Sequence, residues 1–325
     1  MSAQSLPAWE PDVLGPGFEA RTLPLGADAE GELIATLVRH TGLRGDGPWA
    51  DADVLYVHGW SDYFFQAELA GRVAGLGARF FALDLRKYGR SLRPGQTPGY
   101  IEDLGAYDEE IERALHVMGT SARGRRLVLL GHSTGGLTLS LWADRNPGAA
   151  DALVLNSPWL ELQASGVGRQ ALAPIVNVRA RLDPLAQLPN IDFGYYARSV
   201  SSRLDGEWEY NEEWRPERAF PVRPGWFKAV LAGHARVAGG LNIESPVLTL
   251  LSTSSTLTPR WSPEMLVSDA VLVVQIIAER ALRLGRHVSV ERVDGALHDV
   301  FLSRRPAREA AYEALERWAR YAPWA

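Results

Sequence analysis

The feature that most constrains this chain is a serine placed between glycines at the junction of a strand and a helix. The apolar run Leu127–Leu130 predicts a short buried strand, and the run that begins at Leu137 predicts a helix. Between them lies Gly131-His-Ser133-Thr-Gly135, the G-x-S-x-G pattern of a nucleophile elbow. Because the strand and the helix approach closely in such a turn, only small neighbours fit. We therefore expect Ser133 to have strained backbone geometry and an exposed hydroxyl; an ordinary glycine-rich turn is the alternative.

Composition excludes several classes of protein. The 325 residues carry 34 basic and 39 acidic side chains, and the net charge of −5 gives no electrostatic case for binding nucleic acid or an acidic membrane surface. The absence of cysteine excludes disulfides, thiolate metal sites and a cysteine nucleophile. The first residues lack the basic and apolar segments of a signal peptide, and no apolar run approaches the ~20 residues of a membrane span. We expect a cytoplasmic protein with no integral membrane association, metal or organic cofactor.

Strand and helix patterns alternate along most of the chain after residue 50. The strand patterns occupy residues 18–25, 32–40, 53–57, 79–84, 127–130, 152–156, 246–251 and 287–293. The main helical patterns occupy residues 63–76, 102–118, 270–284 and 305–321. This alternation predicts an α/β fold with a mostly parallel, eight-stranded sheet that has helices on both faces.

One long stretch, residues 158–240, interrupts the alternation. It contains several tryptophans and prolines but no clear strand pattern. Long insertions in compact domains are commonly functional lids, and open α/β sheets bind ligands at the carboxyl ends of their strands. We therefore expect a core of residues 1–157 and 241–325 with a cap of residues 158–240 over that edge; a structural surface excursion is the alternative.

A serine hydroxyl needs a general base, and His298 is the best-placed candidate. It follows the last predicted strand, so its loop should emerge at the same sheet edge as Ser133. We expect His132, inside the elbow, to point away from Ser133 and to pack. An oxyanion needs backbone N–H donors, which Thr134 at the helix N-terminus and Trp60 at the end of another strand are placed to supply. For Trp60, a plain strand-to-helix turn is the alternative.

Four motifs carry a resemblance to a known family. They are His58-Gly-Trp60, Leu83-Asp-Leu-Arg-Lys-Tyr-Gly-Arg-Ser91, Gly131-His-Ser-Thr-Gly-Gly136 and Gly295-Ala-Leu-His-Asp299. Together they resemble the α/β-hydrolase superfamily, in particular its monoacylglycerol lipase and lysophospholipase-like serine hydrolases. The resemblance implies the α/β-hydrolase fold. It also implies Ser133 as nucleophile, His298 as base, and Trp60 and Thr134 as oxyanion donors. One departure is Lys87, where that family usually has glycine.

The second departure concerns the acid that orients the histidine. In the family this acid follows the strand that corresponds to Val247–Leu251 within a few residues, but here Ser252–Thr258 contains no carboxylate. The carboxylates that remain before His298 are Glu264, Asp269, Glu279, Glu291 and Asp294. Glu279 and Glu291 fall inside a predicted helix and strand. We assign the acid to Asp269, if residues 254–268 are an insertion; a simple helix cap at Asp269, with Asp294 or Glu264 as the acid, is the alternative.

These residues predict a carboxylic ester hydrolase of the lipase, esterase or lysophospholipase type that works through an acyl-enzyme, with a Ser133–His298–Asp269 triad. We expect Trp159 and Trp60 to contact a small-molecule ester whose acyl group is apolar. Two alternatives stay open, because fold and triad do not determine the bond that is cleaved. The same triad can act on an amide, a thioester or a carbon–carbon bond, or the chain can be a catalytically silent binder of a small hydrophobic ligand.

Overall fold

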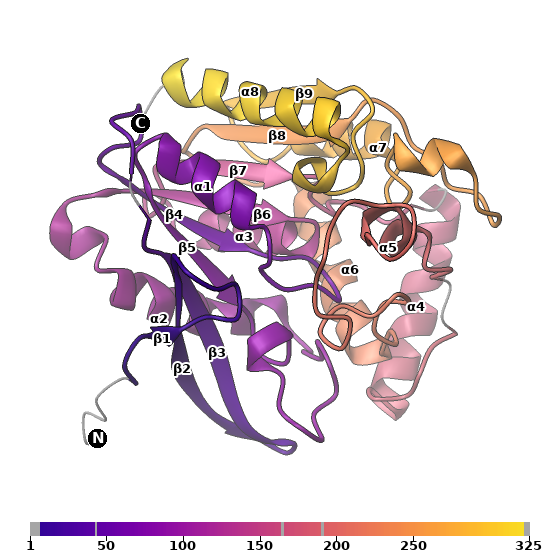
Figure 1. Cartoon of the computed structure of the whole chain (residues 1–325). Coiled ribbons are helices and arrows are strands. Elements are labelled where there is room, and N and C mark those ends of the chain that lie inside the picture. The colour runs from indigo at the N-terminus through magenta and orange to yellow at the C-terminus, as the bar shows by residue number, and fades with distance from the viewer. Residues whose placement is uncertain (1–6, 43, 164–165, 190–191, 322–325) are drawn as a thin grey trace.

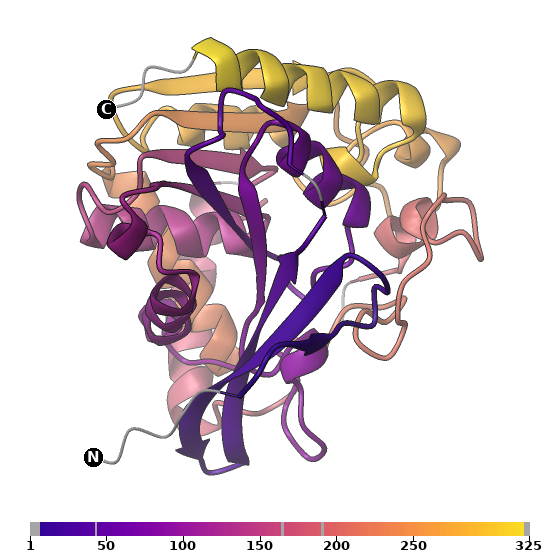
Figure 2. The same ribbon diagram turned by 60° about the vertical axis from the view of Figure 1, so that its left-hand side comes forward.

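The computed structural model describes residues 7–42, 44–163, 166–189 and 192–321, and it is built around one nine-stranded sheet (Figure 1). The strands are β1 (Glu10–Pro11), β2 (Phe18–Asp28), β3 (Gly31–His40), β4 (Ala52–Val57), β5 (Arg79–Asp84), β6 (Arg126–His132), β7 (Ala152–Asn156), β8 (Val247–Ser252) and β9 (Val288–Val293). Their order in the sheet is β1-β2-β3-β5-β4-β6-β7-β8-β9. In this order, neighbouring strands pair antiparallel from β1 to β5 and parallel from β5 to β9, with β4 in the parallel part. The view in Figure 2 shows the strong twist between the β2–β3 hairpin and β8–β9.

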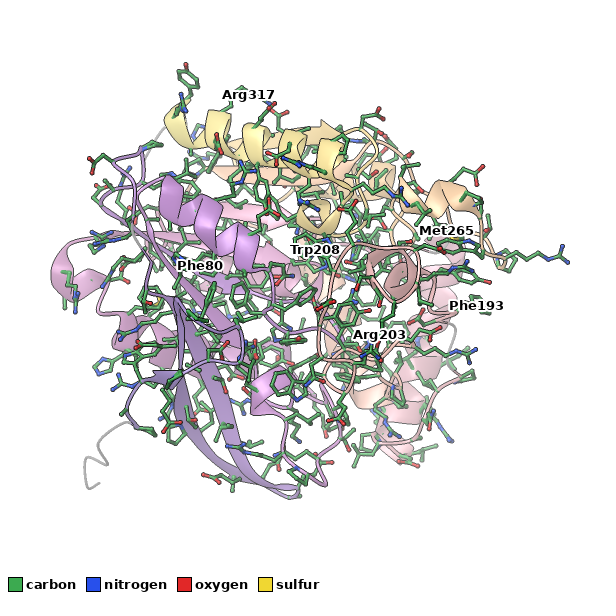
Figure 3. The ribbon with its side chains drawn as sticks, in the orientation of Figure 1. Phe80, Phe193, Arg203, Trp208, Met265 and Arg317 are labelled. Carbon is green, nitrogen blue, oxygen red and sulfur yellow. The ribbon has the colours of Figure 1, made fainter. Side chains whose placement is uncertain are left out.

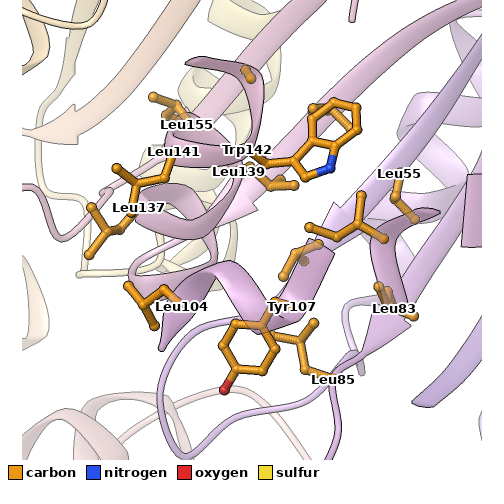
Figure 4. Packing of buried hydrophobic residues seen from close by; sticks show 14 of the residues in the cluster. Leu55, Leu83, Leu85, Leu104, Tyr107, Leu137, Leu139, Leu141, Trp142 and Leu155 are labelled. Carbon is orange, nitrogen blue, oxygen red and sulfur yellow. The ribbon is translucent and has the colours of Figure 1, made fainter. Parts of the chain in front are cut away.

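Helices cover both faces of this sheet, as the alternation predicts. They are α1 (Ala67–Gly75), α2 (Asp108–Met118), α3 (Thr134–Arg145), α4 (Gly166–Leu182), α5 (Tyr195–Val200), α6 (Pro224–Gly239), α7 (Val274–Ala281) and α8 (Arg305–Tyr321). Strand β4 shows that both faces of the sheet are apolar and need a layer of helices. Leu55 and Val57 belong to the main core, under α2, α3, α6 and α7. Val54 and Tyr56 belong to a second core, under α1 and α8. Figure 4 shows the first of these cores.

The α/β-hydrolase architecture is confirmed, and its details differ from the sequence-based prediction in two ways. The sheet has nine strands rather than eight, because the two-residue strand β1 pairs with the edge of β2 and is too short to give a pattern. Three helices begin later than predicted. Helix α1 begins at Ala67 rather than Tyr63, α2 at Asp108 rather than Glu102, and α7 at Val274 rather than Ala270. Buried apolar residues that are not part of the α-helix precede each of them, such as Phe64 before α1, Leu104 before α2 and Leu272 before α7.

Residues 158–240 contain α4, α5 and α6, which lie beyond the arrowheads of the parallel strands in Figure 1. Helix α6 packs on α3 and places Trp226 and Val230 in the main core, and α4 packs against α6. A second attachment is made by Trp208, labelled in Figure 3, whose indole Nε1 donates a hydrogen bond to the carbonyl of Leu302 at 2.8 Å. The segment is therefore attached both to the core under α3 and to the 3₁₀ turn Val300–Leu302 that precedes α8.

Lys87, the residue that departs from the family pattern, has a structural role. Its φ of 63° lies in the left-handed region, which explains why glycine suits this position. The side chain is only 3% exposed, and Nζ binds Asp28 at 2.7 Å and Glu30 at 2.6 Å. Lys87 therefore ties the tip of the β2–β3 hairpin to the loop after β5, and these ion pairs offset the strained backbone.

We predict that Lys87→Met lowers the free energy of unfolding by roughly 1–3 kcal/mol at pH 7, because two charged hydrogen bonds are lost. Burial opposes ionisation of Asp28 and Glu30, but the hydrogen bonds and the charge of Lys87, together with hydrogen bonds from the backbone of Glu30 and from Thr97, outweigh it and lower the pKa of both. Carboxyls with a lowered folded pKa stabilise the protein above their unfolded pKa of about 4, and this contribution disappears as the pH falls through the folded pKa.

Urea unfolding at pH 7 and pH 3 measures the effect. Lys228, the other lysine of the chain, is exposed, so Lys228→Met supplies the matched control. Equal stabilities of the two variants at pH 7 would contradict the prediction.

Candidate active site

Ser133 occupies a strained turn between β6 and α3. Its φ of 51° and ψ of −116° are unfavourable for a residue with a side chain. The neighbouring glycines permit this geometry. A Cβ on Gly131 would lie 2.7 Å from the Cα of Gly136, and a Cβ on Gly135 would lie 2.3 Å from the carbonyl oxygens of Val57 and His58. The glycines thus let α3 begin directly against the ends of β4 and β6.

The side chains of Ser133, His298 and Asp269 form a continuous hydrogen-bonded chain. Nε2 of His298 lies 3.0 Å from Oγ of Ser133, and Nδ1 lies 3.0 Å from Oδ2 of Asp269. An ionised carboxylate only accepts hydrogen bonds, so Nδ1 carries the proton and Nε2 is free to accept the serine proton. Asp269 is fully buried, and its other oxygen accepts hydrogen bonds from the N–H groups of Val271 and Leu272. The arrangement can remove a proton from the serine hydroxyl.

Asp269 reaches this place through an excursion of the chain. Ser255 and Asp269 form a parallel bridge, in which the N–H of Asp269 donates to Ser254 and the N–H of Thr256 donates to Asp269. The chain leaves the sheet edge after Thr256, passes through a 3₁₀ turn at Pro263–Leu266 and returns at Asp269. The residue that follows β8 in space is therefore Asp269, although it follows β8 at a distance in the sequence.

The alternative acids lie elsewhere. Asp294 is exposed and accepts a hydrogen bond from Thr253 Oγ1 at 3.0 Å. Glu264 is exposed in the 3₁₀ turn of the excursion. The helix-capping alternative for Asp269 is correct in part, since one carboxylate oxygen accepts hydrogen bonds from backbone N–H groups in the turn that precedes α7. The other oxygen binds His298.

Thr134 is the first residue of α3, and the loop after β4 that contains Trp60 lies against Ser133. A Cβ on Gly59 would be 3.0 Å from the Cβ of Ser133. His58 holds this loop, because its Nδ1 lies 2.8 Å from the Gly59 carbonyl and its Nε2 accepts a hydrogen bond from Leu85 N–H at 3.1 Å. The backbone N–H groups of Thr134 and Trp60 are therefore carried by segments that meet beside the serine.

Ser133 is buried and lies beside a cluster of tryptophans, which corrects the expectation of an exposed hydroxyl. Ser133 is only 7% exposed. The N–H of Trp159 donates to the carbonyl of Ser133 at 3.0 Å, which brings this residue beside the serine. The ring of Trp226 lies 3.6 Å from that of Trp60 and 6.1 Å from that of Trp159, measured between centroids. The turn places Ser133 at the sheet edge, and residues 158–240 contribute Trp159 and Trp226 to the aromatic cluster next to this turn.

Asn156 and Asp299 form a buried brace that the sequence analysis missed. The carbonyl of Asn156 accepts the N–H of Ser133 at 3.1 Å, and its side chain donates to Asp299 at 2.6 Å and accepts from Val300 N–H at 3.0 Å. The brace joins the serine turn to the loop that carries His298. Its sequence signal was a polar residue at the end of β7 and an aspartate directly after His298, each of which is ordinary alone.

His132 and Tyr196 lie on either side of the His298 ring. Their centroids are 4.9 and 5.3 Å from that of His298. Burial lowers the pKa of His132, which keeps it neutral beside His298. Near Tyr196, Arg215 forms a buried ion pair with Asp62 of the β4 loop at 3.1 Å. This pair connects residues 158–240 to the segment that contains Trp60.

Over residues 7–42, 44–163, 166–189 and 192–321, no helix combines the length and the apolar character needed to cross a bilayer. The same residues contain no cluster of three or more histidine and carboxylate side chains suited to a metal ion.

Comparison with known sequences points to one family. The model of a hydrolase family described as serine aminopeptidase, S33, matches residues 49–304. A monoacylglycerol lipase of Mycolicibacterium smegmatis is 24% identical over 269 residues, which cover 82% of this chain and 86% of the relative. Lysophospholipase L2 of Escherichia coli K12 is 24% identical over 281 residues, which cover 78% of this chain and 75% of the relative.

Solved structures show the same fold. A monoacylglycerol lipase of Paleococcus ferrophilus superposes with a TM-score of 0.62 at 20% identity and covers 89% of this chain and 98% of its own. A carboxyl esterase of Bacillus coagulans superposes with a TM-score of 0.64 at 13% identity and covers 92% and 97%. The predicted resemblance to the α/β-hydrolase superfamily is confirmed.

The close packing at the serine turn predicts that Gly131→Ala destabilises the protein. The added methyl group meets backbone atoms of Gly136, which cannot rotate away, and we expect a loss of roughly 1–3 kcal/mol. Gly71→Ala is the control, because a Cβ on this glycine of α1 meets nothing within 4 Å. It should raise stability by about 0.5–1 kcal/mol. Thermal unfolding of both variants checks the pair, and a Gly131→Ala protein as stable as the wild type would refute the packing argument.

Proposed function

The chain belongs to the serine aminopeptidase S33 family of hydrolases, and from this premise we propose that it cleaves carboxylic esters through an acyl-enzyme. The observation that carries the proposal is the hydrogen-bonded chain from Asp269 through His298 to Ser133. A serine hydroxyl is a weak nucleophile until a base removes its proton, and the base must be held in one tautomer. The three buried side chains meet both requirements.

The proposed reaction has two halves. Ser133 Oγ attacks the ester carbonyl while its proton passes to Nε2 of His298, and the imidazolium that forms is stabilised by Asp269. His298 then returns this proton to the leaving alcohol, which departs and leaves an acyl-Ser133. In the second half, His298 removes a proton from water, and the resulting attack releases the acid and restores the serine.

Backbone N–H groups are proposed to stabilise the oxyanion. Thr134 supplies one from the N-terminus of α3, where the helix dipole also favours negative charge. Trp60 supplies the other from the β4 loop that His58 holds against Ser133. The Asn156–Asp299 brace keeps the serine turn and the histidine loop in register, so that nucleophile, base and donors approach the carbonyl together.

The names of the relatives favour an ester over an amide. A monoacylglycerol lipase and a lysophospholipase each align with more than three quarters of this chain, and both are named for ester substrates. The family description, serine aminopeptidase, names an amide substrate. An ester with an apolar acyl group also suits the tryptophan rings beside Ser133. We assign residues 158–240 as a cap because they bring Trp226 and Tyr196 to the site.

We predict that a fluorophosphonate probe labels the wild-type protein and that Ser133→Ala abolishes both labelling and hydrolysis of p-nitrophenyl acetate. The expected loss in kcat is on the order of 10⁴-fold or more, because the members of a triad act as a unit. A parallel panel of anilides separates esterase from amidase activity. Wild-type protein that is folded but neither labelled nor active on any ester would instead indicate a silent binder.

We predict that Asp269→Asn lowers kcat by roughly 10³ to 10⁴-fold, because an amide in this place favours the wrong tautomer of His298. Asp294→Asn is the matched control and should keep near wild-type kcat, since Asp294 contacts Thr253 at the surface. Steady-state kinetics with circular dichroism of each variant decide the point. The assignment fails if the Asp269→Asn protein stays active while the Asp294→Asn protein does not.

A further inference from the structure

Trp226 of α6 occupies the space between the two tryptophans that flank the nucleophile. Its ring lies against that of Trp60 in a tilted arrangement, with centroids 3.6 Å apart and an angle of 32° between the planes. It lies 6.1 Å from the ring of Trp159, whose N–H binds the carbonyl of Ser133. Two rings in such close contact leave no room for an alkyl chain to pass between them.

Trp226 is held firmly in this place. Its side chain is only 2% exposed and belongs to the main core. Trp60, which it contacts, lies edge-on to the rings of Tyr88 and Phe220. At the start of α6, the N–H of Gly225 donates to the carbonyl of Pro184 at 3.0 Å. Because the ring is packed in the core and its helix start is hydrogen-bonded, Trp226 keeps its position and limits the space beside it.

The tryptophans lie on the acyl side of the proposed reaction. His298 returns its proton to the leaving alcohol, so the alcohol must lie on the side of His298. The residues that flank His298 pack in the cores under α1 and α8 or beside α5, whereas Trp60, Trp159 and Trp226 pack in the core with α3. The acyl group, on the opposite side of Ser133 from His298, therefore points toward the tryptophans.

We infer that Trp226 ends the acyl-binding space and restricts the substrate to short acyl groups of about two to four carbons. The inference rests on the proposed ester hydrolysis and adds the substrate class. It also separates two roles: Trp60 and Trp159 line the acyl group, and Trp226 sets its length. Aromatic walls suit such a group because they offer a large apolar contact area with little conformational freedom.

The test is a chain-length profile with p-nitrophenyl esters from acetate to dodecanoate. Wild-type kcat/KM should be highest at two to four carbons and fall steeply at eight. In Trp226→Ala, each methylene that enters the vacated space should raise kcat/KM about fourfold, so the ratio of octanoate to acetate should rise at least tenfold. Phe227→Ala is the control, since Phe227 is a neighbouring, half-buried ring of the same helix, and its profile should match the wild type.

A second measurement uses the wild-type protein alone, because Trp226 also contributes to the core. Linear alkylboronic acids form a bond from boron to Ser133 Oγ as the serine proton passes to His298, so they report on the acyl side directly. Inhibition should strengthen up to about four carbons and weaken beyond that. Wild-type activity that is highest at eight carbons or more, or boronic acids that bind more tightly up to ten carbons, would overturn the inference and leave ester hydrolysis intact. Activity on no ester of any length would overturn both.

Discussion

The site depends on the backbone strain stored where the parallel strands end. Among the described residues, the non-glycine positions with positive φ are Ser61, Lys87, Ser133 and Ser157. They follow β4, β5, β6 and β7, which lie side by side in the sheet. Each turns the chain sharply at the same edge, so the loops converge instead of running outward. Strain of this kind persists only where the surrounding structure over-determines it, and here the glycine contacts, the ion pairs of Lys87 and the Asn156 brace do so.

The two faces of the sheet give the two sides of the nucleophile different chemical character. On the α3 face, indole rings in close contact form an apolar cluster. On the other side, His298 is surrounded by polar groups, with Asp269, Asp299 and the Arg215–Asp62 pair nearby. An ester has the same asymmetry, with an apolar acyl chain and a more polar alcohol. Under the proposed ester hydrolysis, this asymmetry orients the substrate by polarity before any specific hydrogen bond forms.

The sequence predicted the parts of the structure that depend on local pattern. The parallel core, the turn at Ser133 and the position of His298 follow from apolar runs, glycine spacing and the order of elements. Asp269 was reached by elimination among carboxylates, because nothing in residues 252–268 indicates that the ends of the excursion pair with each other. The contact of Trp226 with Trp60 was missed, since helix periodicity predicts which face of α6 is buried but not which ring it meets across 166 residues, from 60 to 226. Long-range pairings such as Asn156 with Asp299 leave no local signal.

The position of Asp269 does not depend on the length of the segment between Thr256 and Asp269. Its two ends are joined by backbone hydrogen bonds next to β8, and the carboxylate leaves from that junction. The cost of closing a flexible loop grows only slowly with its length. Insertions and deletions among residues 257–267 can therefore accumulate during evolution while the geometry around His298 stays the same. Related chains can differ in this segment and still share one active site, so sequence alignments that require the acid at a constant spacing from the strand will overlook such members.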